Sequence, residues 1–313
     1  MEYSPIPFCA ERLGPHRGPG RHRLVDDPDE SDLVLFTECH QVGTDWTLRT
    51  IRTSPIARRF SHKTAVYNER DRPWCCLPGV YVSMPASGFV PRWQVAGSYL
   101  SIEPPAARLG LDPGVVQPDL LFSFVGSPTH RCRAEIFRMR TARSHVERVD
   151  SFMFHDATSE RFAERRLNFA RIMLRSRFVL CPRGHGTSSF RLYEALSVGR
   201  VPVIISDAWV PPSGPNWDEI SLRWPEARVG ELPRYLAEHE DAARAMGERA
   251  RNAYERWFAK DVVLDHQLDQ LGQLMADDGS ARFPRRGYRN IQYMRTARGA
   301  AIAGAKGIRD RHF

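Results

Sequence analysis

The residues with the clearest chemical potential lie in one segment, 176–207, of this 313-residue chain. A Pro-Arg-Gly-His-Gly run at 182–186 follows an apolar stretch, and Thr-Ser-Ser at 187–189 comes next. Glycines let a ligand approach the backbone closely, and the free N–H groups at the start of a helix favour an anion. The pattern therefore predicts an anion site to which Arg183 adds a full charge.

A nucleoside diphosphate fits this arrangement, with its phosphates on Arg183 and on the helix start. Ser188, Arg191 and Glu194 are spaced by three and lie on roughly one side of the helix, where Glu194 can accept hydrogen bonds from ribose hydroxyls. The segment matches neither G-x-x-x-x-G-K-[ST] nor G-x-G-x-x-G, which excludes the two common phosphate loops. If these residues are considered by themselves, the alternative is an ordinary strand-to-helix turn with an N-cap.

Short apolar runs of the kind found in buried parallel strands must position this segment. The predicted strands are 33–37, 64–67, 99–102, 120–125, 178–181 and 201–205. The predicted helices are 158–177, 188–198 and 238–275. Gly199 is expected at the C′ position of the second helix. The strand–helix–strand–helix–strand order from residue 120 to 205 indicates a parallel α/β sheet.

The sequence predicts two α/β halves joined by a Pro- and Gly-rich linker near 104–118. The expected parts are an irregular N-terminal arm at 1–30, a domain at 31–115, a second domain at 116–280 and a basic tail at 281–313. Ligands of open parallel sheets bind beyond the carboxyl ends of the strands. We therefore expect functional residues directly after the predicted strands.

Composition narrows the class of protein. With 42% hydrophobic and 26% charged residues, the chain is neither disordered nor fibrous, and no apolar run approaches the roughly 20 residues that span a bilayer. The six cysteines form no C-x-x-C pair, which argues against a zinc ribbon and favours a reducing cytoplasm. The net charge of +8 is almost all arginine and suits an anionic ligand. The sequence shows no zinc-finger spacing, aromatic RNP run or leucine zipper that would support binding to nucleic acid.

One pattern in the segment 176–207 is long and specific. It reads S-x-F-x-L-x-P-x-G, then serines, R-x-x-E-A, a glycine, P-V and an aspartate. The residues that form it are Ser176, Phe178, Leu180, Pro182, Gly184, Ser188, Ser189, Arg191, Glu194, Ala195, Gly199, Pro202, Val203 and Asp207. Upstream, LFSFVG at 121–126 is followed by Arg131 and Arg133. Together these features resemble the exostosin family of glycosyltransferases, and the similarity extends over residues 27–236.

The resemblance implies a GT-B transferase, in which two doubly wound Rossmann-like domains face a cleft. Such an enzyme holds a UDP-sugar mainly in its C-terminal domain, here 116–280. It inverts the anomeric centre and transfers the sugar to a glycan or glycoconjugate acceptor in polysaccharide biosynthesis. We expect no cofactor and no metal, because arginines and a helix start can stabilise the departing diphosphate. The residues expected to bind the nucleotide-sugar are Arg131, Arg183, Gly184, His185, Ser188, Ser189, Arg191 and Glu194.

The base that removes the acceptor proton is expected in the acceptor-side domain, 31–115. Glu69 and Asp71 follow one predicted strand and Glu38 follows another, so all three lie at ligand-facing strand ends. Glu69 or Asp71 is favoured over Glu38, and a solvated or arginine-paired carboxylate is the alternative for each. The metal-dependent glycosyltransferases of the other major architecture, which is not GT-B, use a D-x-D motif. The run Asp27-Pro28-Asp29 has that spelling, but it precedes its strand and is expected to be a solvated loop.

Two alternatives stay open. A non-catalytic module that binds a nucleotide-sugar or a glycan on the same fold would share every feature except the base. The basic tail from Arg282 to Arg311 either contacts anionic lipid, which would make a cytoplasmic enzyme peripheral to the membrane, or is disordered.

Overall fold

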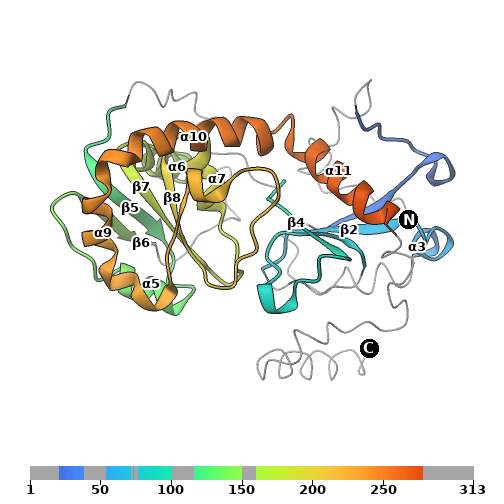
Figure 1. The fold of residues 1–313 in the computed structure, drawn as a ribbon, viewed down its shortest axis with the longest axis horizontal. Coiled ribbons are helices and arrows are strands. Elements are labelled where there is room, and N and C mark those ends of the chain that lie inside the picture. The colour runs from blue at the N-terminus through green and yellow to red at the C-terminus, as the bar shows by residue number, and fades with distance from the viewer. Residues whose placement is uncertain are drawn as a thin grey trace. The chain divides into compact units, whose positions relative to one another are not determined.

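A computed structural model of the protein describes residues 21–38, 54–71, 73, 77–100, 116–149 and 160–277. The chain divides into two compact units. One contains the residues up to Gly97, Ala208–Val210 and the residues from Asp265 onward, and the other contains Ser98–Asp207 and Pro211–Leu264. Each unit holds one sheet (Figure 1). Among the described residues, no helix has the length and apolar character that a membrane span requires.

The first unit is built on a four-stranded parallel sheet in the order β1-β2-β3-β4. Its strands are β1 (Val34–Glu38), β2 (Thr64–Asn68), β3 (Gly79–Tyr81) and β4 (Gln94–Ala96). Its short helices are η2 (Pro28–Glu30), α3 (Pro55–Arg59) and η3 (Ala86–Gly88). Every residue of β2 is buried, as expected for an inner strand of a parallel sheet. The strands predicted at 33–37 and 64–67 are confirmed as β1 and β2.

The second unit is built on a five-stranded parallel sheet in the order β6-β5-β7-β8-β9. Its strands are β5 (Leu120–Gly126), β6 (Ser144–Arg148), β7 (Ser176–Pro182), β8 (Val201–Ile205) and β9 (Leu222–Arg223). The helices are α5 (Arg131–Ile136), α6 (Glu160–Leu174), α7 (Phe190–Ser197), α8 (Trp217–Ile220), η4 (Glu226–Glu231), α9 (Leu232–Glu238), η5 (Glu240–Ala242) and α10 (Ala243–Trp257). A last helix, α11 (Val263–Ala276), runs on into the first unit. The prediction of an α/β protein with parallel sheets is confirmed.

Apolar residues cover both faces of the second sheet. On one face Phe122, Phe178 and Val203 join a core cluster with residues of α5, η4 and α9. The alternating residues Val179 and Cys181 of β7 are each 1% exposed as well. Because both faces are buried, β7 and β8 appear in the sequence as continuous apolar runs, which is why their positions could be predicted.

Local hydrogen bonds explain where the helices of this unit end. Gly199, predicted at C′ of α7, has φ of 64°, and the N–H groups of Gly199 and Arg200 donate to Leu196 and Ala195 at 3.0 Å each. This pair of bonds is a Schellman motif, which stops α7 directly before β8. The helix predicted at 158–177 ends earlier, at Leu174, and the hydroxyl of Ser176, the first residue of β7, donates to the carbonyl of Ile172 at 2.7 Å.

Two other sequence predictions differ from the structure. The helix expected over 238–275 is divided into η5, α10 and α11, and the break follows Phe258, whose ring packs against Tyr193 and Trp217. The strand expected at 99–102 is absent at Tyr99 and Leu100, the two of its residues that the structure describes. The Tyr99 ring instead contacts Phe190, with ring centroids 4.2 Å apart.

The strand order of the second sheet indicates where a ligand binds. After β5 the chain adds β6 on one side and then crosses to add β7 on the other side, so β5 and β7 form a topological switch point. In open α/β sheets, ligands bind in the crevice outside the carboxyl ends of the strands at such a point. The turns that follow β5, β7 and β8 are therefore the place to look for a site.

Candidate functional site

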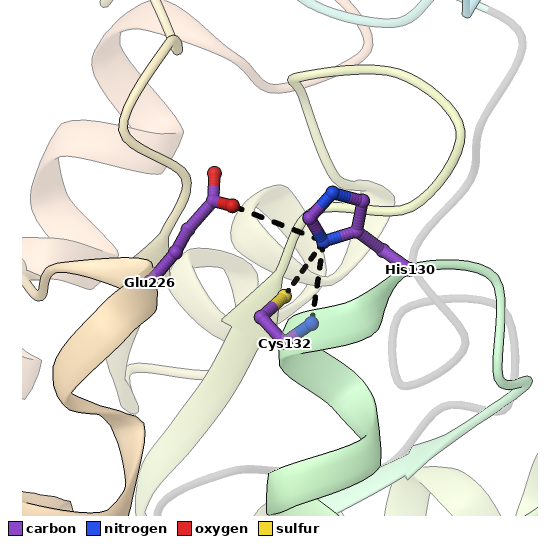
Figure 2. Close-up of side chains that lie close together, drawn as sticks. All are labelled: His130, Cys132 and Glu226. Atoms are coloured by element: carbon purple, nitrogen blue, oxygen red, sulfur yellow. Dashed lines mark hydrogen bonds and ion pairs between the residues drawn. The ribbon is translucent and has the colours of Figure 1, made fainter.

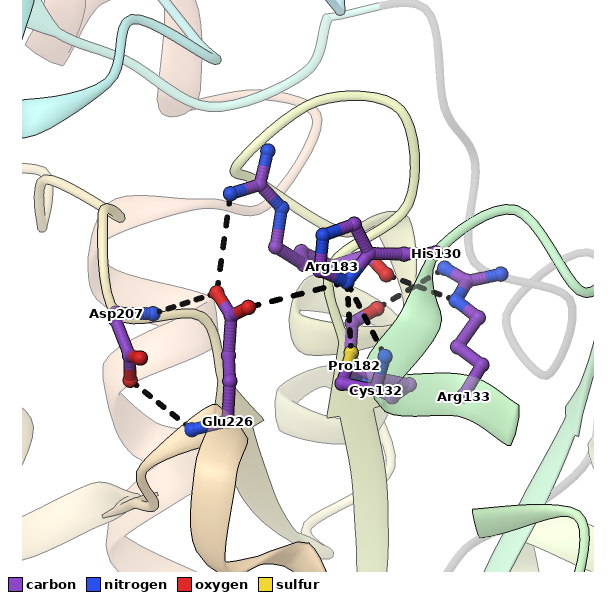
Figure 3. A network of polar contacts seen from close by, with 7 residues as sticks. All are labelled: His130, Cys132, Arg133, Pro182, Arg183, Asp207 and Glu226. Atoms are coloured by element: carbon purple, nitrogen blue, oxygen red, sulfur yellow. Dashed lines mark hydrogen bonds and ion pairs between the residues drawn. The ribbon is translucent and has the colours of Figure 1, made fainter. Parts of the chain in front are cut away.

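Arg133 of α5 fixes the backbone at the switch point. Its Nε donates to the carbonyl of Arg183 at 2.8 Å and its Nη2 to that of Pro182 at 3.0 Å (Figure 3). Its Nη1 donates to the carbonyl of Ser127 at 2.9 Å. The residue is 7% exposed, and its guanidinium lies over the ring of Phe124. A planar guanidinium presents several donors in a fixed geometry, which suits this triple contact. Arg133 thus joins the turn after β5 to the turn after β7.

The neighbouring Arg131, predicted to bind the nucleotide, is exposed on the first turn of α5. Its distance of two residues from Arg133 turns the two side chains to different sides of the helix. Arg133 precedes Ile136 by three residues, and Ile136 is fully buried. That spacing is the sequence signal that marks Arg133, rather than Arg131, as the inward-facing arginine.

The turn after β7 holds the predicted phosphate-binding residues. A Cβ atom on Gly184 would lie 3.1 Å from Nη2 of Arg133 and 3.2 Å from Oγ1 of Thr129, so any larger residue there would press on these two side chains. His185 is exposed, Ser188 is buried, and Ser189 is the N-cap residue of α7. The helix predicted to begin at Ser188 therefore begins two residues later, at Phe190.

Of the two residues predicted on one side of α7, Arg191 is buried and Glu194 is half-buried. The Arg191 guanidinium lies between the rings of Phe124 and Phe169, at 5.4 and 5.1 Å from their centroids. Burial lowers the pKa of Arg191, and the charge of Glu194 opposes that effect. Burial raises the pKa of Glu194, against the opposing charge of Arg191. The structure brings the two groups together inside the unit, and the ribose contact of Glu194 stays a prediction.

Glu226, the first residue of η4, faces Arg183. The distance from Nη1 of Arg183 to Oε1 of Glu226 is 3.8 Å, and the side chains are 20% and 9% exposed. Glu226 and Asp207 also exchange hydrogen bonds: each backbone N–H donates to the other's carboxylate at 3.1 Å (Figure 3). The sequence patterns do not point to Glu226, because its partners are far away along the chain and no local spacing marks the contact.

His130, Cys132 and Glu226 form a cluster of potential metal ligands, whose ligand atoms lie within 4.8 Å of one another (Figure 2). Two of these groups already contact each other, because Nδ1 of His130 accepts from the Cys132 N–H at 3.4 Å and lies 3.2 Å from the Cys132 Sγ. Burial raises the pKa of the Cys132 thiol to about 11, so the thiol stays protonated at neutral pH. The positive charges of Arg183, Arg131 and Arg133 also act on His130, and the charge of Glu226 opposes them.

The three candidate bases lie at the carboxyl edge of the first sheet. Glu38 ends β1 and pairs in register with Asn68 of β2, so its backbone lies beside the turn that carries Glu69 and Asp71. Glu69 is 2% exposed, Asp71 is half-buried, and the Glu38 side chain lies outside the described residues. Their role as a base stays a prediction.

The D-x-D run lies before β1, at the opposite end of that strand. Asp27 and Asp29 are exposed in and beside η2, where Asp27 accepts a hydrogen bond from the Asp29 N–H at 2.9 Å. Asp29 pairs with Arg59 at 2.6 Å. The predicted solvated acidic loop is what the structure shows at these residues.

Acidification is expected to destabilise the fold through His130. Burial, followed by the positive charge of Arg183, lowers the pKa of His130 from its ordinary value of 6.5. The unfolded chain therefore binds a proton at this ring more readily than the folded protein. The effect is absent well above pH 6.5 and grows as the pH falls from there towards the lower pKa of the folded state.

Urea unfolding between about pH 8 and about pH 5.5 measures this effect. The matched variant is His130→Asn, which keeps a capping side chain but does not titrate. Wild type should lose stability relative to this variant as the pH falls. Parallel profiles for the two proteins would show that His130 is not the responsible group.

Comparison with known proteins shows which family the chain is similar to. A family model described as the Exostosin GT47 domain matches residues 60–238, more than half of the chain. An exostosin-1 homolog of Caenorhabditis elegans is 32% identical over 107 residues, which cover 33% of this chain and 28% of the relative. Exostosin-1 of Drosophila melanogaster is 32% identical over 101 residues, covering 30% and 13%. A protein of Arabidopsis thaliana named "Probable glycosyltransferase" is 39% identical over 72 residues, covering 22% and 15%. The matched part thus spans less than a third of each relative.

Proposed function

Because the chain belongs to the exostosin GT47 family, we propose that it is a glycosyltransferase that moves a sugar from a UDP-sugar to a glycan or glycoconjugate acceptor. One observation carries the assignment of the donor site. The turn after β7, with Arg183 and Gly184, is clamped by Arg133 at the switch point of the second sheet. A clamped turn that presents a cation and a glycine at this position suits a diphosphate.

The proposed reaction is a single displacement with inversion, in an enzyme of the GT-B type with two Rossmann-like domains. As the bond from the anomeric carbon to the diphosphate breaks, negative charge develops on the leaving oxygen. Arg183 and the backbone N–H groups before α7 stabilise that charge without a metal. His185 is exposed in the same turn and can donate a proton to the leaving oxygen. Glu194 is proposed to hold the ribose.

The acceptor hydroxyl is proposed to lose its proton to a carboxylate of the first unit. Asp71 and Glu69 follow β2, and Glu38 ends β1. A base must lie within hydrogen-bond reach of the proton that it removes. Asp71 is more accessible than Glu69, which favours Asp71 of the two.

Nucleotide release from UDP-, GDP- and ADP-sugars, with a mixture of glycan acceptors and with EDTA present, tests this function. We expect UDP to be released from at least one UDP-sugar only when an acceptor is added, with EDTA without effect. Asp71→Asn, Glu69→Gln and Glu38→Gln then identify the base, since the right substitution keeps UDP binding and abolishes release. UDP binding with no release from any donor would instead indicate a non-catalytic binding module.

A further inference from the structure

Glu226 connects three turns that are distant in the sequence. Its carboxylate is 3.8 Å from Nη1 of Arg183, in the turn after β7, and 3.9 Å from Nδ1 of His130, at the start of α5. The same carboxylate accepts the N–H of Asp207, in the turn after β8. Among the residues drawn in Figure 3, Glu226 is the one whose contacts reach all three turns.

The geometry points to Glu226 as a positioning residue for Arg183, which holds the guanidinium ready for the diphosphate of the donor. This inference rests on the proposed function, because it concerns the same anion site. Glu226 is not assigned contact with the reacting atoms. It acts on the nucleotide through Arg183.

The Arg183 backbone is held independently of its side chain. Nε of Arg133 donates to the Arg183 carbonyl at 2.8 Å, which fixes where the side chain begins. The Nε of Arg183 itself is buried and has no hydrogen-bond partner within the described part of the chain. The direction of the guanidinium therefore depends on the contact of Nη1 with Glu226.

Glu226 is a firm anchor for this purpose because its own position is fixed twice. Its N–H donates to Oδ1 of Asp207 and its Oε1 accepts from the Asp207 N–H, both at 3.1 Å. The side chain is 9% exposed, so solvent screens its charge only partly. An arginine that is held before the ligand arrives loses less side-chain freedom on binding, and the saved entropy appears as affinity.

The test is UDP affinity, measured by titration calorimetry with EDTA present, for the full chain with Glu226→Gln. Glutamine has the same shape and keeps an oxygen to accept the Asp207 N–H, but it carries no charge to hold Arg183. We expect UDP and inorganic pyrophosphate to bind about 2- to 10-fold more weakly than to wild type. Affinity equal to or tighter than that of wild type would overturn the inference.

Glu231→Gln is the matched control. Glu231 lies in the same 3₁₀ helix and pairs with Arg228 on the surface, at 2.6 Å. Its substitution should leave UDP affinity unchanged, and urea midpoints of both variants report whether the fold is intact. If Glu226→Gln does not fold, Glu226→Asp replaces it, because aspartate keeps the charge and withdraws it by one methylene.

A double-mutant cycle with Arg183→Ala separates positioning from a general structural role. If Glu226 acts through Arg183, then Glu226→Gln causes no further loss of UDP affinity in the Arg183→Ala background. Equal losses in both backgrounds would mean that Glu226 supports the fold rather than Arg183, and would overturn the inference. If Arg183→Ala alone leaves UDP affinity unchanged, the proposed donor site itself is at fault.

Discussion

Replacing Arg133 by alanine is expected to lower the free energy of unfolding by about 3–5 kcal/mol, since three carbonyl oxygens lose a charged donor that is worth about 1–3 kcal/mol each. Water can reach some of these oxygens, because Ser127 and Arg183 are only half-buried, so the total stays below the sum. The turn after β7 loses its anchor at the same time. UDP affinity should therefore fall together with stability, and urea unfolding measures the larger effect.

The matched control for this prediction is Arg131→Ala, two residues away on the same helix. Arg131 is exposed, and surface substitutions usually change stability by less than about 0.5 kcal/mol. Arg133→Lys should resemble Arg133→Ala, because one ammonium group cannot reach all three carbonyls. Equal stability of Arg133→Ala and Arg131→Ala would show that the clamp does not hold the fold.

Replacing Arg183 by alanine is expected to weaken UDP binding by about 30-fold or more. In the proposed complex Arg183 and the diphosphate form a buried charge pair, and truncating one partner of such a pair costs about 2–5 kcal/mol. Stability should change little, since the ion pair with Glu226 is long, at 3.8 Å, and partly exposed. Isothermal titration calorimetry of UDP, with urea unfolding in parallel, measures both quantities.

Ser188→Ala provides the comparison for Arg183→Ala. A contribution from the start of α7 is worth about 0.3–1 kcal/mol, so this variant should bind UDP less than about tenfold more weakly. If Arg183→Ala bound UDP as tightly as wild type, or if Ser188→Ala were the more damaging of the two, the assignment of the phosphate site to Arg183 would be wrong.

The parts of the fold that could be predicted are those in which sequence pattern and burial agree. The inner strands β7 and β8 are buried on both faces, so β8 and the part of β7 from Phe178 onward form apolar runs. The edge strand β6 reads Ser-His-Val-Glu-Arg and is only half-buried, so it has no such signal. β9 has two residues and β3 and β4 have three each, which is too short for any periodicity.

The residues of the site also differ in how far they could be predicted, because some depend on a local motif and others on contacts between distant segments. Arg183 and Gly184 could be predicted because their chemistry lies in one continuous motif. The role of Arg133 depends on the phase of a short helix, which His130 sets by capping it. Glu226 reaches the site only through the crossover from β8 to β9 and η4. No spacing along the chain reports that contact, so the structure was needed to find it.

The most direct test of a UDP-sugar donor site is the thermal stability of the wild-type chain with UDP, GDP or ADP, in the presence of EDTA. A ligand at 100 times its dissociation constant adds about 2.7 kcal/mol of stability, which is readily seen as a shift in Tm. We predict a shift with UDP that GDP and ADP do not reproduce and that EDTA does not remove. No shift with any nucleotide, or a shift that appears only when a divalent metal is added, would contradict a metal-independent UDP-sugar transferase.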